Sequence, residues 1–181
     1  LSVRGPHLSA EETAEAVQWA QDNGFEMELL DLNPLQMKAV EFNHTDRCYF
    51  CKKHLFLELK RRAADLPLCD GTNHSDLSHY RPGLKALSEL KIHSPLAEAE
   101  FSKQDNREVG ALIGLDHWDQ AARPCMLTRL PYNQKVLASD LTALGETETA
   151  MNRFFAGLNK GEIRFRLRKV SPETFEMPIQ R

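Results

Sequence analysis

The feature that most constrains this chain is a pair of cysteines set among cationic residues, in the run Arg47-Cys48-Tyr49-Phe50-Cys51-Lys52-Lys53. If Cys48 opens a helix, both sulfur atoms lie on one face of it, near the positive N-terminal end. Such surroundings favour the thiolate over the thiol. Two thiolates at this spacing serve as ligands of a metal or cluster, as a redox pair, or as a nucleophile with a neighbour. The rest of the chain has to decide between these roles.

The composition is typical of a soluble globular protein. The 181 residues suit one domain, or one domain with a small appendage, and 41% of them are hydrophobic and 27% charged. The net charge of −3 gives no basic field, so we expect no nucleic-acid partner. No apolar run approaches the roughly 20 residues that span a bilayer, and the N-terminus has no secretory apolar region. We therefore expect a cytoplasmic protein with no membrane partner.

Four cysteines in such a chain indicate metal binding or catalysis rather than a disulfide framework. They are Cys48, Cys51, Cys69 and Cys125. The first two and Cys125 supply three soft ligands, which suit a [4Fe–4S] cluster with one open iron, or a zinc ion with a fourth ligand from elsewhere. Cys69 follows an apolar run, so we interpret it as a buried, inert thiol rather than as that fourth ligand.

The start of the chain has the pattern of an α/β repeat. Leu1-Ser2-Val3 has the composition of the end of a strand. Ser9 and Glu12 form a capping box, which predicts a helix that stops at Asn23-Gly24. A strand over residues 25–32 should follow, and a helix joined to a strand in this way is half of an α/β unit. The residues expected on the inner face of the helix are Ala10, Ala14, Val17 and Ala20.

The cysteine pair should lie on a helix over residues 48–64, because apolar residues recur there at helical spacing. A short apolar run over residues 66–69 then predicts a buried strand that ends in Asp70-Gly71-Thr72-Asn73. Polar groups at the carboxyl end of such a strand occupy the position where open α/β sheets bind ligands. The same four residues also form an ordinary turn, so both interpretations stay open.

The middle of the chain predicts two more helices and a loop. Residues 84–90 form the first of these helices, and residues 102–114 form the second. Cys125 follows in a proline-containing loop between Arg123 and Arg129, rather than in a core element. That position leaves this third thiol open to chemistry.

From residue 133 the pattern changes, and we place a domain boundary near residue 132. A helix is expected from Ser139 to about residue 157. Residues 163–168 then alternate strictly between apolar residues and arginines, as in a strand with one exposed face. Their planar guanidinium groups bind phosphate or carboxylate, but a solvated strand face has the same pattern. These arginines are Arg164, Arg166 and Arg168.

The seven histidines are scattered, and none forms the His-x-x-x-His pair that binds metal on a helix. We therefore treat each as structural or exposed, and only His74 and His79 form a pair worth testing for metal. Glu98 and Glu148 have the pattern of surface acids, although each is able to neutralise an arginine or to position magnesium. The histidines are His7, His44, His54, His74, His79, His93 and His117.

A set of motifs, taken together, resembles one family. They occur in the order and with the spacing of the LarE family of ATP-dependent sulfur transferases, which belongs to the PP-loop ATP pyrophosphatase superfamily. The resemblance covers about residues 7–168, nearly the whole chain, and no single motif would suffice for it. The motifs are Arg47-Cys48-Tyr49-Phe50-Cys51-Lys52, Asp70-Gly71-Thr72-Asn73, Tyr80-Arg81-Pro82-Gly83, Ser94-Pro95-Leu96-Ala97-Glu98, Gly114-Leu115 and Arg123-Pro124-Cys125-Met126-Leu127-Thr128-Arg129.

The resemblance implies an activity. Members of the family use ATP, with Mg²⁺, to adenylate a carboxylate of a pyridinium mononucleotide, release pyrophosphate, and then install sulfur to give a thiocarboxylate. The product is part of the nickel-pincer nucleotide cofactor of lactate racemase. The chemistry of the residues agrees with this, because a sulfur nucleophile attacks an acyl adenylate while cationic donors stabilise the phosphate charge.

The resemblance also implies roles for individual residues. Cys125 matches the catalytic, sulfur-handling cysteine, which is sacrificed and becomes dehydroalanine in members that have only this cysteine. Members that also carry Cys-x-x-Cys resemble cluster enzymes, so a [4Fe–4S] cluster on Cys48, Cys51 and Cys125 is favoured here, with zinc possible instead. The other implied roles are substrate binding by Arg129, Glu148, Arg164 and Arg166, and nucleotide binding by Asp70, Gly71, Thr72 and Asn73.

The chain departs from the family at the nucleotide loop. The family's Ser-Gly-Gly-x-Asp-Ser loop cradles the ATP phosphates on the first βα unit, belongs upstream of residue 1, and does not occur in this sequence. Two explanations stay open. The chain is a fragment that carries the sulfur-handling part of an enzyme, which its start at Leu1 favours, or it is a short paralogue that has lost the ATP chemistry.

We therefore predict an α/β domain over residues 1–132, with a parallel PP-loop-type sheet (adenine nucleotide alpha hydrolase-like) that lacks its first βα unit. A smaller α+β domain should follow over residues 133–181. The expected function is ATP-dependent conversion of a nucleotide-linked carboxylate into a thiocarboxylate, by a homo-oligomer with a small-molecule nucleotide substrate. The alternatives are a PP-loop tRNA thiolation enzyme, against which the net charge of −3 counts, and a non-catalytic zinc or iron–sulfur protein.

Overall fold

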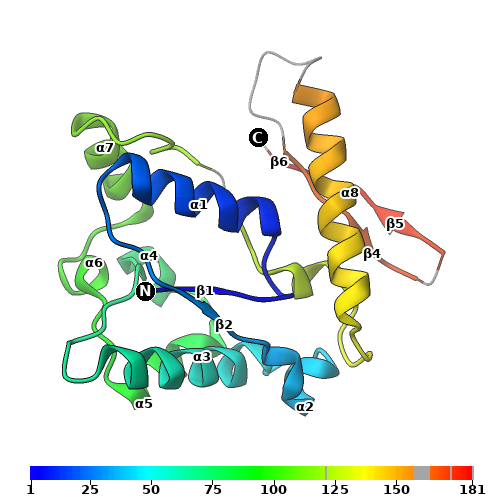
Figure 1. Cartoon of the computed structure of the whole chain (residues 1–181), viewed down its shortest axis with the longest axis horizontal. Coiled ribbons are helices and arrows are strands. Elements are labelled where there is room, and N and C mark those ends of the chain that lie inside the picture. The colour runs from blue at the N-terminus through cyan, green and yellow to red at the C-terminus, as the bar shows by residue number, and fades with distance from the viewer. Residues whose placement is uncertain (121, 157–163, 172, 181) are drawn as a thin grey trace. The chain divides into compact units, whose positions relative to one another are not determined.

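The computed structural model describes residues 1–120, 122–156, 164–171 and 173–180, and of residues 164, 179 and 180 it describes the backbone alone. Contacts within the chain define two compact units, which are described separately here. The first unit comprises Leu1–Thr45 and Arg123–Arg181, and the second comprises Asp46–Ala122. Figure 1 shows the helices and strands of both units.

The first unit opens with a β–α–β arrangement. Strand β1 (Ser2–Arg4) pairs in parallel with strand β2 (Leu29–Asp31), and helix α1 (Ala10–Asp22) connects them (Figure 1). The strand expected at the N-terminus is thereby confirmed. The strand predicted over residues 25–32 is present only in its second half, because residues 25–28 lack a ladder of backbone hydrogen bonds.

Both ends of α1 follow the sequence prediction. The Ser9 hydroxyl accepts a hydrogen bond from the N–H of Glu12 at 3.4 Å, as an N-cap does. At the other end the N–H of Asn23 donates to the carbonyl of Trp19, and Gly24 takes a positive φ of 71°. Glycine adopts that left-handed conformation without steric cost, so the chain leaves the helix there.

The inner face of α1 is less buried than the pattern predicts. Only Ala20 is buried, at 1% exposure, and Val17 is half-buried. Ala10 and Ala14 are exposed, because they line a cavity of about 820 Å³ that β1 and helix α8 (Ala138–Ala156) also border. The prediction that these two alanines face a packed core is therefore wrong.

The core of the first unit is formed with short elements from both of its sequence segments. These are the 3₁₀ helix η1 (Pro34–Gln36) and helix α2 (Lys38–Glu41), which pack together, and the 3₁₀ helix η2 (Met126–Arg129), which packs with α8. The predicted helix from Ser139 corresponds to α8, which begins one residue earlier. The buried apolar side chains of this unit are Ala20, Val40, Met126, Leu127, Val136, Leu141, Leu144 and Phe165.

The alternating segment near the C-terminus forms two short strands rather than one. Strand β3 (Arg164–Phe165) pairs antiparallel with β6 (Ile179–Gln180), and β4 (Arg168–Lys169) pairs antiparallel with β5 (Phe175–Glu176). The predicted strand is interrupted at residues 166–167, where the N–H of Leu167 donates to a side chain instead of a strand. Residue 163 lies outside the described residues.

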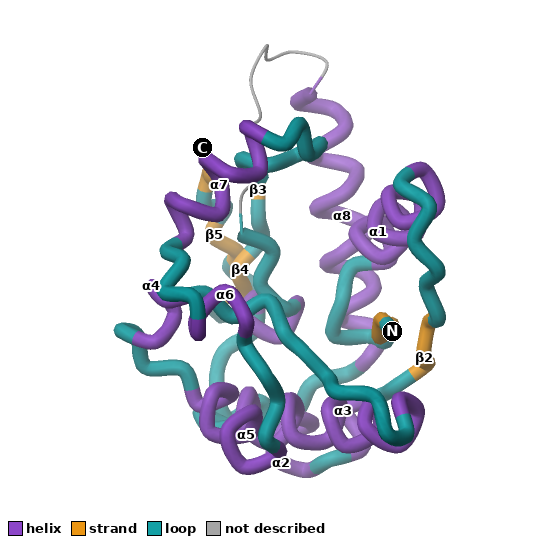
Figure 2. Tube along the Cα trace, turned by 90° about the vertical axis from the view of Figure 1, so that its left-hand side faces the viewer, coloured by secondary structure: helices purple, strands orange, loops and turns teal. Residues whose placement is uncertain are grey.

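The second unit is built on two packed helices. Helix α3 (Arg47–Ala63) confirms the helix predicted over residues 48–64, and helix α5 (Pro82–Leu90) confirms the one predicted over residues 84–90. They lie side by side (Figure 2). Gly83 permits this close approach, because a Cβ there would lie 3.0 Å from Cδ of Lys52.

The strand predicted over residues 66–69 is not formed. Cys69 alone makes a parallel bridge, to His93, through the bonds from Asp70 N to the His93 carbonyl at 2.8 Å and from His93 N to the Leu68 carbonyl at 3.1 Å. Pro67 has no N–H with which to extend this pairing. Cys69 is exposed, so its interpretation as a buried thiol is wrong.

Three further helices complete the second unit. They are α4 (His74–Leu77), α6 (Pro95–Glu98) and α7 (Lys103–Leu112). A capping box starts α7: the Ser102 hydroxyl accepts from the N–H of Asp105 at 3.1 Å, and the Asp105 carboxylate accepts from the N–H of Ser102 at 2.8 Å. The helix predicted over residues 102–114 is confirmed by α7.

The described residues therefore form a mixed α/β structure that is mostly helical and contains a small parallel sheet. The α/β class is confirmed, whereas the PP-loop type of the sheet and the division at residue 132 stay predictions. Along the described part of the chain, no helix is both long enough and apolar enough to cross a bilayer.

Candidate functional site

The cysteine pair lies at the start of α3. The helix begins at Arg47, with Asp46 as its N-cap, so Cys48 and Cys51 fall on one face within its first turns, as the spacing predicts. Cys48 is exposed and Cys51 is half-buried, and neither is in a disulfide. Arg47 is 4% exposed, so it anchors the first turn while the cysteines face outward.

A carboxylate next to this helix joins three of the motifs. Asp70 accepts hydrogen bonds from the hydroxyl of Ser94 at 2.6 Å, from the hydroxyl of Thr72 at 2.6 Å and from the backbone N–H of Thr72 at 3.2 Å. The ammonium group of Lys52, on α3, lies 3.2 Å from the same carboxylate.

The donors around Asp70 keep it ionised. Burial raises the pKa of Asp70, but the hydrogen bonds from Ser94 and Thr72 and the charge of Lys52 outweigh burial, so the pKa lies below its ordinary value. The carboxylate is thus occupied by its own protein. The structure explains Asp70 and the buried Thr72 by this local role, and nucleotide binding by them stays a prediction.

The rest of the Asp-Gly-Thr-Asn motif also serves the backbone. Asn73 is the N-cap of α4, accepting from the N–H of Asp76 at 3.2 Å, and Asp76 completes the capping box. Asp76 in turn pairs with Arg81 at 2.7 Å. Gly71 is exposed, and a side chain there would meet nothing. The turn interpretation of this motif therefore accounts for its geometry.

The loop that carries Cys125 lies in the first unit and is held by a buried guanidinium group. Nη1 of Arg129 donates to the carbonyl of Pro124 at 2.6 Å and to the hydroxyl of Thr128 at 3.1 Å, and it reaches the carbonyl of Cys125 at 3.4 Å. Cys125 itself is half-buried. The backbone around the thiol is therefore fixed while the residue keeps access to solvent.

Arg129 forms a bidentate ion pair with Glu148 of α8. Its Nε and Nη2 donate to the two carboxylate oxygens, each at 3.0 Å, and the side chains are 6% and 10% exposed. One oxygen of Glu148 also accepts from the N–H of Leu167 at 2.8 Å. The interpretation of Glu148 as a surface acid is wrong. Substrate binding by Arg129 and Glu148 stays a prediction, against which their mutual pairing counts.

Sequence reasoning missed Asn43, which holds the same loop from the other side. Asn43 is fully buried, and its Nδ2 lies 3.3 Å, 3.1 Å and 2.8 Å from the carbonyls of Leu127, Leu130 and Pro131. Its φ of 50° is left-handed, a conformation that asparagine tolerates better than most residues. An asparagine directly after a short helix was the available signal.

His7, which the sequence indicates to be structural or exposed, is a second residue that supports the Cys125 loop. Its carbonyl accepts the N–H of Met126 at 2.9 Å, which ties the residue after Cys125 to the loop that follows β1. The side chain is 3% exposed, and its Nδ1 has no hydrogen-bond partner among the described residues. Burial lowers the pKa of His7 to about 4, so the imidazole is neutral at pH 7.

The structure describes the two arginines predicted to bind phosphate, Arg164 and Arg166, to different extents. Arg166 is half-buried, and its backbone N–H donates to the carbonyl of Pro178 at 3.2 Å. The backbone of Arg164 belongs to β3, and its side chain lies outside the described residues. Substrate binding by both stays a prediction.

The three cysteines predicted to share a cluster belong to different units: Cys48 and Cys51 to the second and Cys125 to the first. Within the part of the chain that the structure describes, no three His, Cys, Asp or Glu side chains are grouped so as to hold a metal ion, and this includes His74 and His79. The shared cluster is therefore still a prediction. The three cysteines suit such a cluster chemically, because Cys48 is exposed, Cys51 and Cys125 are half-buried, and none of them is in a disulfide.

Comparison with known proteins gives three relatives. The chain is 36% identical over 167 residues to an uncharacterized protein of Synechocystis sp., a match that covers 91% of this chain and 62% of that protein. It is 31% identical over 140 residues to an uncharacterized protein of Methanocaldococcus jannaschii, covering 76% and 53%. It is 34% identical over 125 residues to the pyridinium-3,5-bisthiocarboxylic acid mononucleotide synthase of Lactiplantibacillus plantarum, covering 67% and 45%. No family model matches the chain.

The similarity to the synthase supports the LarE-like resemblance that the motifs indicate. The chain spans between 45% and 62% of the length of these three relatives. The similarity thus concerns a part of each relative, and what the whole synthase does is not transferred to this chain by similarity alone.

Proposed function

We propose that this chain handles sulfur in an ATP-dependent sulfur transferase, which activates a nucleotide-linked carboxylate by adenylation and converts it into a thiocarboxylate. Cys125 is the sulfur-handling residue in this proposal. The similarity to the synthase, over 67% of the chain, supports the substrate class. The product of that class belongs to nickel-pincer cofactor biosynthesis in the LarE family that the motifs resemble.

The observation that carries the proposal is the construction of the Cys125 loop. The carbonyl of Pro124 is held by Arg129 at 2.6 Å, and the carbonyls that follow η2 are held by Asn43. Both anchoring side chains are buried, whereas Cys125 is only half-buried. A cysteine on an immobilised backbone keeps the sulfur delivered there in a fixed position toward an acyl carbon, which is the geometry that nucleophilic sulfur transfer needs.

In the chemical step, a sulfide delivered at Cys125 would form a bond to the carbonyl carbon of the acyl adenylate, and the bond from that carbon to the phosphate oxygen would break, so that AMP leaves and the thiocarboxylate remains. Charge develops on the phosphate as it leaves. We propose that Arg166 stabilises this charge, as the motif resemblance implies, while Arg129, which is paired with Glu148, positions the Cys125 loop. The neutral, buried His7 leaves the surroundings of the Cys125 loop without an added positive charge.

We further propose that Cys48, Cys51 and Cys125 hold a [4Fe–4S] cluster. Cys48 and Cys51 offer accessible sulfur atoms on one face at the positive end of α3. When bound, such a cluster would supply a sulfide on the iron that has no protein ligand. ATP and Mg²⁺ are the proposed co-substrates of the activation step.

The activity is tested with the acyl adenylate supplied preformed, so that sulfur transfer is measured apart from ATP use. The full chain, reconstituted anaerobically with iron and sulfide, should convert the adenylate of a pyridinium mononucleotide carboxylate into the thiocarboxylate, detected by mass spectrometry. Cys125→Ala should abolish product, and Cys69→Ala is the matched control that should retain it. Product from the Cys125→Ala variant would remove Cys125 from its role.

The cluster is tested separately by metal analysis. Iron and acid-labile sulfide should be present in the wild-type chain and should fall sharply in Cys48→Ala, Cys51→Ala and Cys125→Ala, but not in Cys69→Ala. Stoichiometric zinc without iron would contradict the cluster and favour the zinc alternative. Equal iron in all four variants would contradict the proposed ligand set.

A further inference from the structure

Cys69 has a close neighbour that its sequence position does not suggest. The parallel bridge makes Cys69 and His93 direct partners. Residues opposite each other in a parallel pair point their side chains to the same face, and the paired backbones lie about 4.8 Å apart. The thiol and the imidazole are therefore within reach of each other by side-chain rotation alone.

A carboxylate lies next to the imidazole of His93. Nδ1 of His93 lies 3.5 Å from Oε1 of Glu98. The same oxygen accepts the N–H of Ser94 at 3.1 Å, so the backbone fixes the carboxylate at the end of α6. A carboxylate at Nδ1 favours the tautomer that carries hydrogen there, which leaves Nε2 as a proton acceptor.

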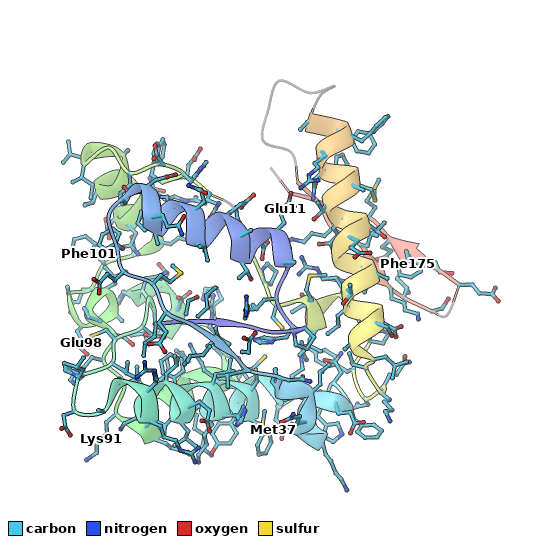
Figure 3. All side chains as sticks on the ribbon, viewed as in Figure 1. Glu11, Met37, Lys91, Glu98, Phe101 and Phe175 are labelled. Carbon is cyan, nitrogen blue, oxygen red and sulfur yellow. The ribbon has the colours of Figure 1, made fainter. Side chains whose placement is uncertain are left out.

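All three side chains are open to solvent. Cys69 is exposed, and the side chains of His93 and Glu98 are 61% and 60% exposed. Figure 3 shows Glu98 at the edge of the second unit, on α6. The thiol is therefore accessible to a small reactant in solution.

We propose that Cys69, His93 and Glu98 form a nucleophilic thiol site that accepts sulfane sulfur from a persulfide. His93 takes the proton of the Cys69 thiol, and Glu98 is a positioning residue that orients the imidazole. The Cys69 thiolate attacks the outer sulfur of a persulfide R–S–SH; the new bond joins Sγ to that sulfur, and the S–S bond of the persulfide breaks. The proton held by His93 goes to the leaving thiolate, so that the products are Cys69–S–SH and R–SH.

The surroundings of Cys69 favour a sulfur electrophile over an acyl group. Acyl transfer needs backbone N–H groups aimed at an oxyanion. The N–H groups of Asp70, Thr72 and Ser94 are already bonded, at 2.8 Å, 3.2 Å and 3.1 Å, to oxygens within the unit. Exchange at sulfur passes through no oxyanion and requires only a thiolate and a leaving thiol. The site is thus suited to persulfides, and it does not depend on the function proposed for Cys125.

The test uses the full chain, reduced and freed of metal, with glutathione persulfide as the probe. After short reaction times the thiols are blocked with iodoacetamide, and peptide mass spectrometry measures sulfane sulfur on each cysteine. Cys69 should gain it roughly a hundredfold faster in the wild type than in the His93→Ala variant, as loss of a general base predicts. Glu98→Gln keeps the acceptor for Ser94 and should slow the reaction by a smaller factor.

Two further measurements separate catalysis from structure. Added imidazole should restore part of the rate of His93→Ala, an effect that a purely structural role for His93 would not give. The persulfidation of Cys48 in the same samples is the internal control and should not change. Equal rates at Cys69 in the wild type and in His93→Ala would overturn the proposal. Because Cys125→Ala should leave this reaction intact, failure here is distinguishable from failure of the proposed sulfur transfer.

Discussion

Two loops that carry predicted site residues are each held by an ion pair, and the two pairs differ in burial. In the first unit, Arg129 and Glu148 are 6% and 10% exposed and meet through two parallel hydrogen bonds. In the second unit, Lys52 is 33% exposed while Asp70 is 9% exposed, and they meet at a single distance of 3.2 Å. Both side chains of the first pair are thus buried, whereas Lys52, the cation of the second pair, remains partly exposed to water.

The difference shows what each carboxylate depends on. Among the described residues, Glu148 receives two guanidinium bonds from Arg129 and one further bond, from the N–H of Leu167. Asp70 receives most of its hydrogen bonds from neutral donors on Ser94 and Thr72, so its charge is satisfied even without the cation. Truncating the cation should therefore be costly in the first loop and mild in the second.

The largest effect is expected from Arg129→Met. This change leaves Glu148 buried without a partner, which typically costs about 3–5 kcal/mol in the free energy of unfolding. Urea denaturation followed by circular dichroism measures it. Arg153→Met is the matched control, because Arg153 pairs with Glu11 near the surface, at 75% and 32% exposure, and Figure 3 labels that glutamate on the first turn of α1. Equal losses for the two variants would contradict the role of burial.

The double variant Arg129→Met/Glu148→Met separates an uncompensated charge from lost packing. Removing both charges should recover much of the stability, because an apolar pair of similar volume is often neutral or better than a buried ion pair. A double variant no more stable than Arg129→Met would mean that the carbonyls of Pro124 and Cys125 need the guanidinium donors.

The next effect is a pH dependence that originates at His7, whose carbonyl accepts the N–H of Met126 next to Cys125. Burial lowers the pKa of His7 from an ordinary value of 6.5 to about 4. Above pH 6.5 neither state binds the proton; between pH 6.5 and about 4 only the unfolded state binds it, so stability falls as the pH falls. The loss should reach roughly 3 kcal/mol, at about 1.4 kcal/mol per pKa unit.

Denaturation of the wild type and of His7→Gln at a series of pH values measures this loss. The slope between pH 6.5 and 4 should be shallower in His7→Gln, whereas His74→Gln, at an exposed histidine, should keep the wild-type slope. The lowered pKa of Asp70 acts below this window, since its stabilisation is lost as the pH falls below the ordinary value of 3.8. An unchanged slope in His7→Gln would show that the burial of His7 is not maintained in solution.

The sequence predicted the local structure better than the long-range partners. The capping pattern at Ser9 and the helical spacing after Cys48 are encoded within a few residues, and α1 and α3 have the expected bounds. The pairing of Arg129 with Glu148, or of Cys69 with His93, joins residues about twenty positions apart. No local pattern specifies such a pair, because it depends on how the chain folds back.

The same limit explains why some residues predicted to bind ligands have partners inside the protein instead. Asp70 and Arg129 stand out in the sequence as charged residues within motifs, and motif position alone does not distinguish a ligand contact from an internal one. The structure gives both of them internal partners. Asn43 carries no charge and belongs to none of the motifs. Its amide nevertheless donates to the carbonyls of three residues that follow Cys125 in the chain: Leu127, Leu130 and Pro131.

A moderate effect is expected from Asp70→Ala. The change removes the acceptor shared by Ser94 and Thr72 and leaves the buried Thr72 hydroxyl unsatisfied, which costs about 2 kcal/mol. Thermal unfolding measures it. Asp31→Ala is the control, because Asp31 pairs with Arg4 at the surface and should give no measurable change. A loss as large as that of Arg129→Met would mean that the two loops do not differ as their burial indicates.

The smallest effect is expected from Lys52→Met, which truncates the cation of the second pair as Arg129→Met truncates that of the first. Lys52 is one third exposed, so its charge is screened by water and its loss should cost about 1 kcal/mol or less. Asp70 keeps the hydrogen bonds from Ser94 and Thr72, which lower its pKa more than the charge of Lys52 does. The acid unfolding midpoint should therefore stay close to that of the wild type. A loss of several kcal/mol would show that Asp70 relies on the ammonium group, as Glu148 relies on its guanidinium partner.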